Sequence, residues 1–141
     1  MSNELFPDTG AKLLIYTDGG SRGNPGPAAI GFVVGSKSYG MTIGRTTNNV
    51  AEYQAIIFAL KKAKQLLGKI KAKQTDLEVR MDSELAMKQL NGKYKIENAD
   101  LQPLFLEVWN SKLDFKSVIF KHVPREENRK ADEMVNRALD E

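Results

Sequence analysis

The chain contains no cysteine and a single histidine in 141 residues. Without cysteine there are no disulfides, no thiolate metal ligands and no cysteine nucleophile, and this composition suits a reducing compartment. No apolar run approaches the ~20 residues that span a membrane, and the first residues lack the basic-then-apolar pattern of a secretory signal. We therefore expect a cytoplasmic protein without a membrane segment.

The length suits one domain with one hydrophobic core. Hydrophobic residues make up 41% and charged residues 28%, as in ordinary soluble globular proteins. We expect residues 12–141 to form this domain and residues 1–11, which have no hydrophobic periodicity, to form a flexible tail.

The positive charge is unevenly placed, although the net charge is only +3. Residues 61–73 (KKAKQLLGKIKAK) hold six lysines and no acid. A solvated helix face explains such a block, and so does binding to a phosphate backbone. The sequence leaves both interpretations open.

Residues 13–26 (LLIYTDGGSRGNPG) are the stretch around which the chain is organised. The apolar run at 13–16 predicts a strand buried on both faces, and Asp18 stands at its end. A carboxylate there is costly to desolvate unless a cation meets it. One interpretation is a metal ligand beside glycines over which a phosphate-bearing polymer lies; the other is a strand ending in an Asp-Gly turn.

Apolar periodicity and turn residues predict five strands and four helices. Thr47 or Asn48 can cap the longest helix, and Gly68 can end it. The expected strands are residues 12–17, 27–34, 38–45, 77–82 and 115–121, and the expected helices are residues 48–67, 83–90, 100–112 and 128–139. The order βββαβααβα predicts an α/β fold in which three antiparallel strands begin a mixed sheet flanked by helices.

Four carboxylates stand at junctions of these elements. They are Asp18 and Asp82 at the ends of two strands, Glu52 in the second turn of the long helix, and Asp132 in the first turns of the last helix. Parallel pairing of the two strands would bring Asp18 and Asp82 together at the edge where ligands bind in α/β sheets. Oxygen ligands without histidine or cysteine favour Mg²⁺ or Mn²⁺, and two such ions serve phosphoryl transfer. Each acid alone could instead be a helix-dipole partner or a turn residue.

Four segments, YTDGGSRGNPGPAAIG, TTNNVAEYQAI, MDSEL and HVPREENRKADEMVN, resemble type 1 ribonuclease H in sequence, order and separation. The resemblance covers residues 12–141 and implies the ribonuclease H-like fold, with a five-stranded mixed sheet. It implies an endonuclease that hydrolyses the RNA strand of RNA–DNA hybrids with two Mg²⁺ ions, for which Mn²⁺ can substitute, and without an organic cofactor. We expect a monomer that leaves 5′-phosphate and 3′-hydroxyl ends.

The same resemblance implies roles for individual residues. Asp18, Glu52, Asp82 and Asp132 match the metal-binding catalytic acids, and His122 matches a loop histidine that assists proton transfer or product release. The residues matching substrate contacts are Gly20, Ser21 and Asn24 toward RNA 2′-hydroxyls, with Gly19 beside them, Asn48 and Asn49 toward bases and sugars, Arg45 and Thr47 toward a DNA-strand phosphate, and Glu84, where some relatives have an amide.

The chain departs from some members of this family between the third acid and the last strand. Residues 89–109 are too short for a lysine-rich helix insertion, so the chain resembles the compact branch. We expect Lys88, Lys93 and Lys95, with the lysines of residues 61–73, to replace part of the insertion's charge. Trp109 lies on an apolar helix face, and we expect it in the core rather than on a base-stacking surface.

Other functions are compatible with the fold. A non-catalytic module for hybrids or duplexes would be expected to lack one of the acids, and an integrase or resolvase would not need the residues that match 2′-hydroxyl contacts. Dinucleotide binding is excluded because the glycines lead through Pro25 and Pro27 into a strand and not into a helix.

Overall fold

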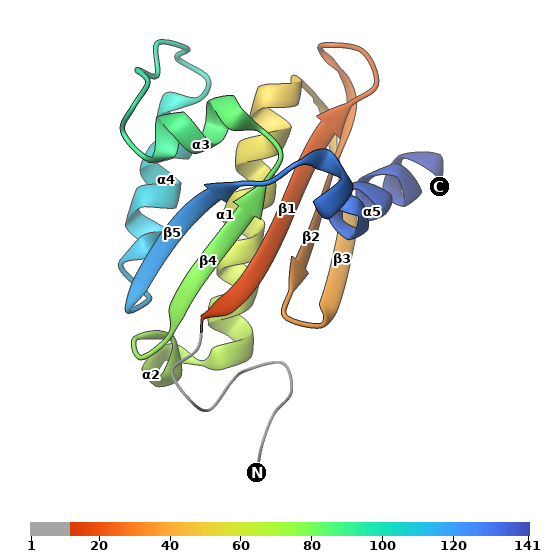
Figure 1. The fold of residues 1–141 in the computed structure, drawn as a ribbon. Helices are drawn as coiled ribbons and strands as arrows, with labels where there is room; N and C mark the ends of the chain where they lie inside the picture. Colours follow the sequence, from red (N-terminus) through yellow and green to blue (C-terminus); the bar gives the residue numbers. More distant parts are fainter. Residues whose placement is uncertain (1–11) are drawn as a thin grey trace.

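The first strand, β1 (Leu13–Ser21), lies at the centre of a five-stranded sheet with the order β3-β2-β1-β4-β5 (Figure 1). A computed structural model describes residues 12–141, so the tail predicted for residues 1–11 lies outside the described residues. The other elements are β2 (Gly26–Val34), β3 (Lys37–Thr46), α1 (Asn48–Leu67), α2 (Lys69–Ala72), β4 (Asp76–Met81), α3 (Glu84–Leu90), α4 (Gln102–Lys112), β5 (Ser117–His122), the 3-10 turn η1 (Arg125–Glu127) and α5 (Arg129–Asp140).

The sheet combines an antiparallel half with a parallel half. Strands β1, β2 and β3 form an antiparallel meander, and β1, β4 and β5 run parallel. The predicted parallel pairing of the first and fourth strands is confirmed, with Thr17 opposite Met81. Asp18 and Asp82, the residues that follow this pair, therefore lie close together at one edge of the sheet.

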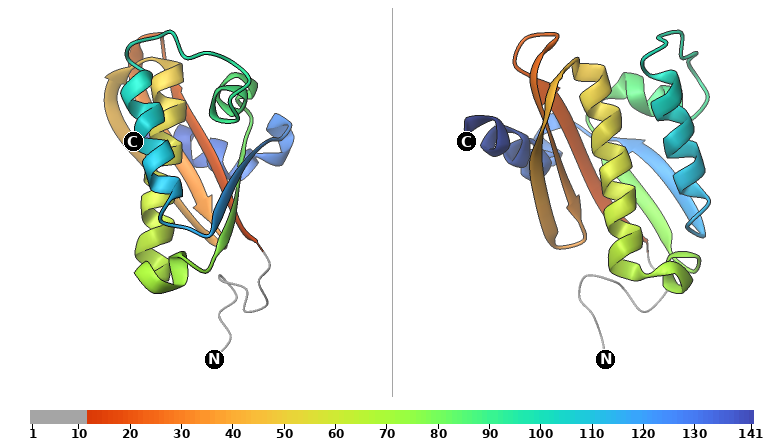
Figure 2. Two further views of the ribbon diagram at one scale, coloured as in Figure 1. Left: turned by 90° about the vertical axis from the view of Figure 1, so that its left-hand side faces the viewer. Right: turned by 180° about the vertical axis from the view of Figure 1, so that it is seen from behind.

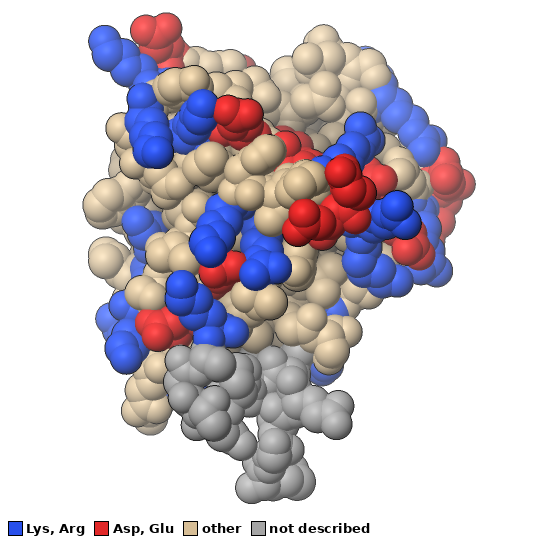
Figure 3. Space-filling model, viewed as in Figure 1, with Lys and Arg blue, Asp and Glu red and all other residues tan. Residues whose placement is uncertain are grey.

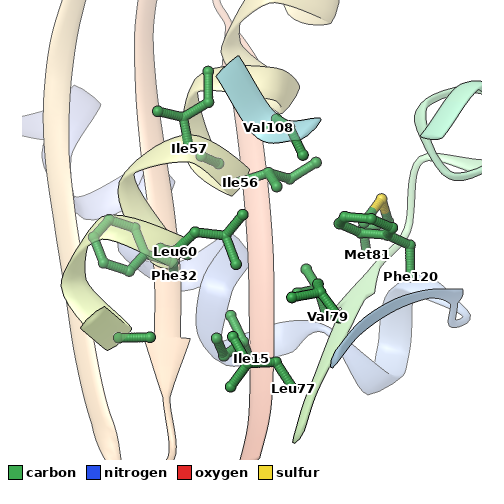
Figure 4. Packing of buried hydrophobic residues seen from close by; sticks show 14 of the residues in the cluster. Ile15, Phe32, Ile56, Ile57, Leu60, Leu77, Val79, Met81, Val108 and Phe120 are labelled. Atoms are coloured by element: carbon green, nitrogen blue, oxygen red, sulfur yellow. The ribbon is translucent and has the colours of Figure 1, made fainter. Parts of the chain in front are cut away.

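Helices α1 and α4 cover one face of the sheet, and α5 covers part of the other (Figure 2). The core lies between α1 and the sheet, where side chains such as Ile15, Leu60 and Val79 interdigitate (Figure 4). Each such side chain contributes about 1.5–3 kcal/mol when it is fully buried. Helix α1 can lie flat on the sheet because small residues recur along its buried stripe, namely Ala51, Ala55, Ala59 and Ala63.

The predicted fold class and the order of the main elements are confirmed, with differences at the ends of elements. Strand β1 continues past Asp18 to Ser21, because Ser21 still pairs with Ala28 of β2. Strand β5 ends at His122, so this residue closes a strand and does not stand in the following loop. The short helix α2 and the turn η1 were not predicted, since segments of three or four residues show no periodicity.

The prediction that Trp109 belongs to the core is wrong. Its side chain is 48% exposed, and the Lys112 Nζ lies 4.7 Å from the centre of its ring. The stripe of α4 that faces the core consists of Leu104, Phe105 and Val108. At about 100° per residue, Trp109 is turned by about 100° from Val108 and by about 140° from Leu104, so it falls outside this stripe.

The connection between α3 and α4 is short, as the sequence predicted. Residues 91–101 contain no helix, so the lysine-rich insertion of some type 1 ribonucleases H is missing at this point. None of the described helices is both long and apolar enough to cross a membrane.

Candidate active site

Three carboxylates from three elements meet at the edge where β1 and β4 come together. Asp18 belongs to β1, Asp82 follows β4, and Glu52 reaches in from the second turn of α1. One oxygen from each of the three lies within 4.8 Å of the others. This spacing is short enough for all three to coordinate one metal ion.

Gly19 allows α1 to approach the sheet closely enough for Glu52 to join this group. A Cβ atom on residue 19 would lie 2.2 Å from the carbonyl oxygen of Ala51, far inside contact distance. Any side chain there would push α1 outward. The glycine after Asp18 is therefore needed for helix packing, whatever else it contacts.

Helix α5 brings the fourth carboxylate, Asp132, from the opposite face of the sheet. The helix packs against Gly31 of β2, where a Cβ atom would lie 2.2 Å from the Ala131 carbonyl oxygen. Just before the helix, the buried Asn128 donates a hydrogen bond from Nδ2 to the Thr17 carbonyl oxygen, at 2.9 Å. Asp132 lines the same cleft as the other three acids, although it is outside the group within 4.8 Å.

The carboxyl groups of Asp18 and Glu52 lie where a negative charge is unfavourable. Burial, followed by the negative charges of Asp82 and Asp132, raises the pKa of Asp18 to about 8. Burial, with the charges of Asp18 and Asp82, also raises the pKa of Glu52 well above its ordinary value. The Arg125 charge acts on Asp18 in the opposite direction and is too weak to offset the burial. This cluster therefore favours either protons or a bound cation.

The donor atoms fit a hard divalent cation. The Glu52 Oε2 atom is buried and has no hydrogen-bond partner in the described part of the chain, which is costly unless an ion or a water meets it. All the candidate ligands are carboxylate oxygens, the type that Mg²⁺ and Mn²⁺ prefer over the nitrogen and sulfur ligands of Zn²⁺.

The carboxylates line a cleft of about 400 Å³. Figure 3 shows acidic side chains gathered near the start of α5, with Lys and Arg side chains around them. The cleft also includes four residues that the sequence analysis did not select, namely Arg22, Arg125, Asn136 and Leu139. For Asn136 and Leu139 a signal was present, because they follow Asp132 at spacings of four and seven on the same helix face.

The turn after β1 is fastened to the start of α1 by two asparagines. The Asn48 Oδ1 accepts hydrogen bonds from the Ser21 backbone N–H, at 2.8 Å, and from its Oγ, at 3.1 Å. In return, the Asn24 Oδ1 accepts one from the Asn48 backbone N–H, at 3.0 Å. Gly20, Ser21 and Asn48 line the cleft, as does Gly19, so these predicted substrate residues lie beside the carboxylates.

Other predicted substrate residues lie outside the cleft. Thr47 caps α1, since its Oγ1 accepts a hydrogen bond from the Val50 backbone N–H at 3.2 Å. Arg45 at the end of β3 and Asn49 in the first turn of α1 are exposed. Arg45, Asn49 and Asn24 thus place exposed polar groups on the β1–β2 turn, the end of β3 and the start of α1. We call this set of residues, with Thr47, the rim.

Glu84 and His122 lie on the other side of the carboxylates, at α3 and the end of β5. The Glu84 Oε1 pairs with the Lys88 Nζ at 2.7 Å, which lowers the pKa of Glu84, and the charge of His122 acts in the same direction. Both side chains are exposed, and in the described part of the chain neither of them lines the cleft that contains the carboxylates.

The lysine-rich segment 61–73 lies at the end of α1 away from Glu52 and continues into α2 (Figure 2). The Lys61 Nζ pairs with Glu107 at 3.0 Å, and the Lys64 Nζ pairs with Asp114 at 3.1 Å. The Lys73 Nζ donates a hydrogen bond to the Leu113 carbonyl oxygen at 2.7 Å. These contacts with α4 and its exit favour the solvated helix face over a nucleic-acid surface.

Comparison with known proteins places this geometry in a family. Residues 17–138 match the family described as reverse transcriptase-like. The ribonuclease HI of Halobacterium salinarum is 41% identical over 96% of this chain, which spans 68% of that protein. A bifunctional protein of Mycobacterium tuberculosis is 38% identical over 92% of this chain, which spans 36% of that larger protein.

A solved structure agrees with these sequence matches. LC11-RNase H1, crystallised in complex with an RNA/DNA hybrid, is 45% identical and superposes with a TM-score of 0.86. The superposition covers 92% of this chain and 97% of that one. The match to the family over residues 17–138, together with the identity to a ribonuclease HI over nearly the whole sequence, shows that the chain belongs to the type 1 ribonuclease H family.

Proposed function

We propose that this protein is a metal-dependent endoribonuclease that hydrolyses the RNA strand of RNA–DNA hybrids. The observation that carries the proposal is the set of carboxylate oxygens of Asp18, Glu52 and Asp82 within 4.8 Å of one another. A structural role does not explain a buried group of acids whose Glu52 oxygen lacks a partner. The hybrid named in the LC11-RNase H1 complex supports the choice of substrate.

The four acids would hold two Mg²⁺ ions, with Mn²⁺ as a substitute. Asp18, Glu52 and Asp82 are close enough to share one ion, and Asp132 enters from α5 on the other side of the cleft. Bound in this way, the ions would activate a water for in-line attack and stabilise the leaving oxygen. Cleavage would leave a 5′-phosphate and a 3′-hydroxyl. The pKa values of Asp18 and Glu52 are raised, and a carboxyl that holds a proton must release it before its oxygen can coordinate, so metal affinity rises with pH.

The polar residues beside the acids would read the sugars of the hybrid. Gly19, Gly20, Ser21 and Asn48 border the cleft, and Asn48 holds Ser21 in place. Backbone amides and short polar side chains suit the RNA 2′-hydroxyl, which can donate and accept a hydrogen bond. This contact distinguishes the RNA strand from DNA.

The rim residues would contact the remainder of the duplex. Asn24 would contact RNA 2′-hydroxyls, as Gly20 and Ser21 would. Asn49 would contact bases and sugars together with Asn48, and Arg45 with Thr47 would hold a phosphate of the DNA strand. The Thr47 hydroxyl oxygen already accepts a hydrogen bond from Val50, and its proton remains available to a phosphate oxygen. Glu84, one turn before Lys88, would approach the substrate from α3.

His122 would assist proton transfer or product release. It is exposed at the end of β5, close to Glu84, and it is the only histidine of the chain. An imidazole is the side chain whose ordinary pKa lies nearest to neutrality, so it can exchange protons with solvent during turnover.

A cytoplasmic location and a monomeric state remain predictions.

The experiment that tests this function compares one labelled hybrid with duplex DNA, duplex RNA and single strands of the same sequence. Each substrate is incubated with Mg²⁺, Mn²⁺ or EDTA. We expect cleavage of the RNA strand of the hybrid with either metal and none with EDTA. Tight hybrid binding without cleavage under both metals would favour a non-catalytic hybrid-binding module.

A further inference from the structure

The cleft continues beyond the carboxylates along helix α5. Asp132, Asn136 and Leu139 all line it, and their spacing of four and three places them on one face of the helix. Arg22, in the turn between β1 and β2, also lines the cleft and pairs with Asp140, four residues beyond Asn136 on α5. Beyond Asp132, this arm of the cleft contains none of the four carboxylates and none of the residues that match the family's substrate contacts.

Arg22 crosses from the β1–β2 turn to the end of α5. Its Nη2 lies 2.6 Å from the Oδ1 of Asp140, and the two side chains are 51% and 66% exposed. An ion pair so open to solvent contributes little to stability. The guanidinium can therefore leave Asp140 for another anion at low cost.

The backbone that carries Arg22 is held firmly, although its side chain is exposed. The Arg22 backbone N–H donates a hydrogen bond to the Pro27 carbonyl oxygen at 2.8 Å, which closes the turn. The preceding Ser21 is fastened to Asn48. A cation on such an anchored turn is positioned in advance for a ligand, which reduces the entropy lost on binding.

The charge of the cleft indicates what this cation meets. A nucleic-acid strand brings a phosphate on each side of the bond that is cut, and metal ions at the acids would neutralise only the central one. In the described part of the chain, the cleft lining contains two cations, Arg22 and Arg125. Arg125 lies 3.7 Å from Asp132, next to the acids, whereas Arg22 pairs eight residues further along α5.

We propose that Arg22 is a substrate-binding residue that exchanges Asp140 for a phosphate of the RNA strand flanking the cleavage site. The inference rests on the proposed function. Eight helical residues from Asp132 to Asp140 correspond to about 12 Å, a distance of a few nucleotides at ~3.4 Å each. The guanidinium makes a single contact with Asp140, from Nη2 to Oδ1, and a phosphate can offer it two parallel hydrogen bonds instead, which favours the exchange. Asp140 competes with the substrate for Arg22.

The test measures hybrid affinity for Arg22→Gln and Asp140→Asn, both made in an Asp82→Asn background so that the substrate stays intact. Arg22→Gln should weaken binding about five- to twentyfold and reduce the slope of log K against log salt by about 0.9, the value for one phosphate. Asp140→Asn should strengthen binding, because it frees Arg22. The matched control is Arg137→Gln, since Arg137 is also an arginine of α5 but pairs with Glu133 at 3.6 Å and does not line the cleft.

The opposite directions of the two variants separate this account from a structural ion pair. If the pair only fastened the turn to α5, both variants would weaken binding alike, and this result would overturn the inference. Neutral methylphosphonates placed one at a time in the RNA strand then locate the contact. The methylphosphonate at the contacted phosphate should weaken hybrid binding when Arg22 is present and should have no effect in Arg22→Gln. Absence of hybrid binding in the Asp82→Asn background and in the wild type would instead overturn the proposed function, and this inference with it.

Discussion

Gly19 of β1 lies against Ala51 of α1 so closely that a Cβ atom on residue 19 would be 2.2 Å from the Ala51 carbonyl oxygen. The contact fixes the distance between the strand that carries Asp18 and the helix that carries Glu52. Two of the proposed metal ligands therefore owe their separation to a residue that has no side chain. The close contact between Gly19 and Ala51 therefore matters both for helix packing and for the proposed metal site.

Gly19→Ala should destabilise the fold and separate Glu52 from Asp18. Overpacking of a tight contact costs about 1–3 kcal/mol or more, because the helix backbone has to move. We expect a lower melting temperature and loss of Mg²⁺-dependent protection against thermal unfolding. Gly20→Ala is the matched control, since the nearest atom to its new Cβ is the Asn48 Oδ1 at 3.8 Å. Equal melting temperatures for the two variants would contradict this role of Gly19.

Asp18→Asn should stabilise the metal-free protein, increasingly so as pH rises. The pKa of the Asp18 carboxyl is raised from 3.8 to about 8 in the folded state, so its folded form binds a proton that the unfolded form has released. Between these two values each increase in pH favours the unfolded chain. The amide does not titrate, and its advantage should therefore be small near pH 4 and reach a plateau above about pH 8.

Thermal melts of both proteins in EDTA across this pH range measure the effect of Asp18→Asn. Addition of Mg²⁺ at about pH 8 should reverse the order, because a bound ion stabilises the wild type by linkage and the variant has lost a ligand. A constant difference at all pH values would mean that the Asp18 carboxyl is not forced to keep its proton.

Asn48→Ala should weaken hybrid binding more than it weakens the fold. The variant removes the Oδ1 that accepts two hydrogen bonds from Ser21, at 2.8 and 3.1 Å, and leaves the turn after β1 unfastened. We expect KM to rise about tenfold, as for loss of one or two hydrogen bonds, with a small change in kcat. An unchanged KM would show that Ser21 is held in place without Asn48.

His122→Ala should slow turnover without abolishing it. A side chain that assists proton transfer typically contributes about 10²-fold or more, and the carboxylate cluster remains complete without it. Single-turnover and steady-state rates on the hybrid distinguish slow chemistry from slow product release. Lys121→Ala is the control on the same strand, since the Lys121 Nζ lies 3.5 Å from Glu78 and outside the cleft. Complete loss of activity in His122→Ala would require a larger role for this residue.

The sequence predicted those features that depend on the periodicity of apolar residues within one strand or helix. The apolar runs before Asp18 and Asp82 predicted that these two acids meet at one edge of a parallel strand pair, while the place of Glu52 beside them rested on the family resemblance. The position of Trp109 was predicted wrongly, because the residue types of α4 alone do not show whether its buried stripe includes Val108 or the adjacent Trp109.

Arg22 and Asn136 illustrate the limit of this approach. Arg22 is an exposed arginine in a turn and follows no periodic pattern, and although Asn136 shares a helix face with Asp132, only the approach of α5 to the β1–β2 turn brings both residues to one cleft. That approach depends on Gly31, whose missing side chain is significant only once Ala131 is seen against it. Tertiary packing supplied what periodicity could not.

The measurement that tests the central claim most directly is the rate of RNA-strand cleavage by Asp82→Asn with saturating Mg²⁺ and hybrid. Asp76→Asn serves as the control, because Asp76 lies at the opposite end of β4 and accepts a hydrogen bond from the Ser117 Oγ at 2.7 Å. We expect Asp82→Asn to stay folded and to lose at least about 10³-fold in rate, while Asp76→Asn stays near wild type. Near-wild-type cleavage by Asp82→Asn would contradict the assignment of the acid cluster as the catalytic site.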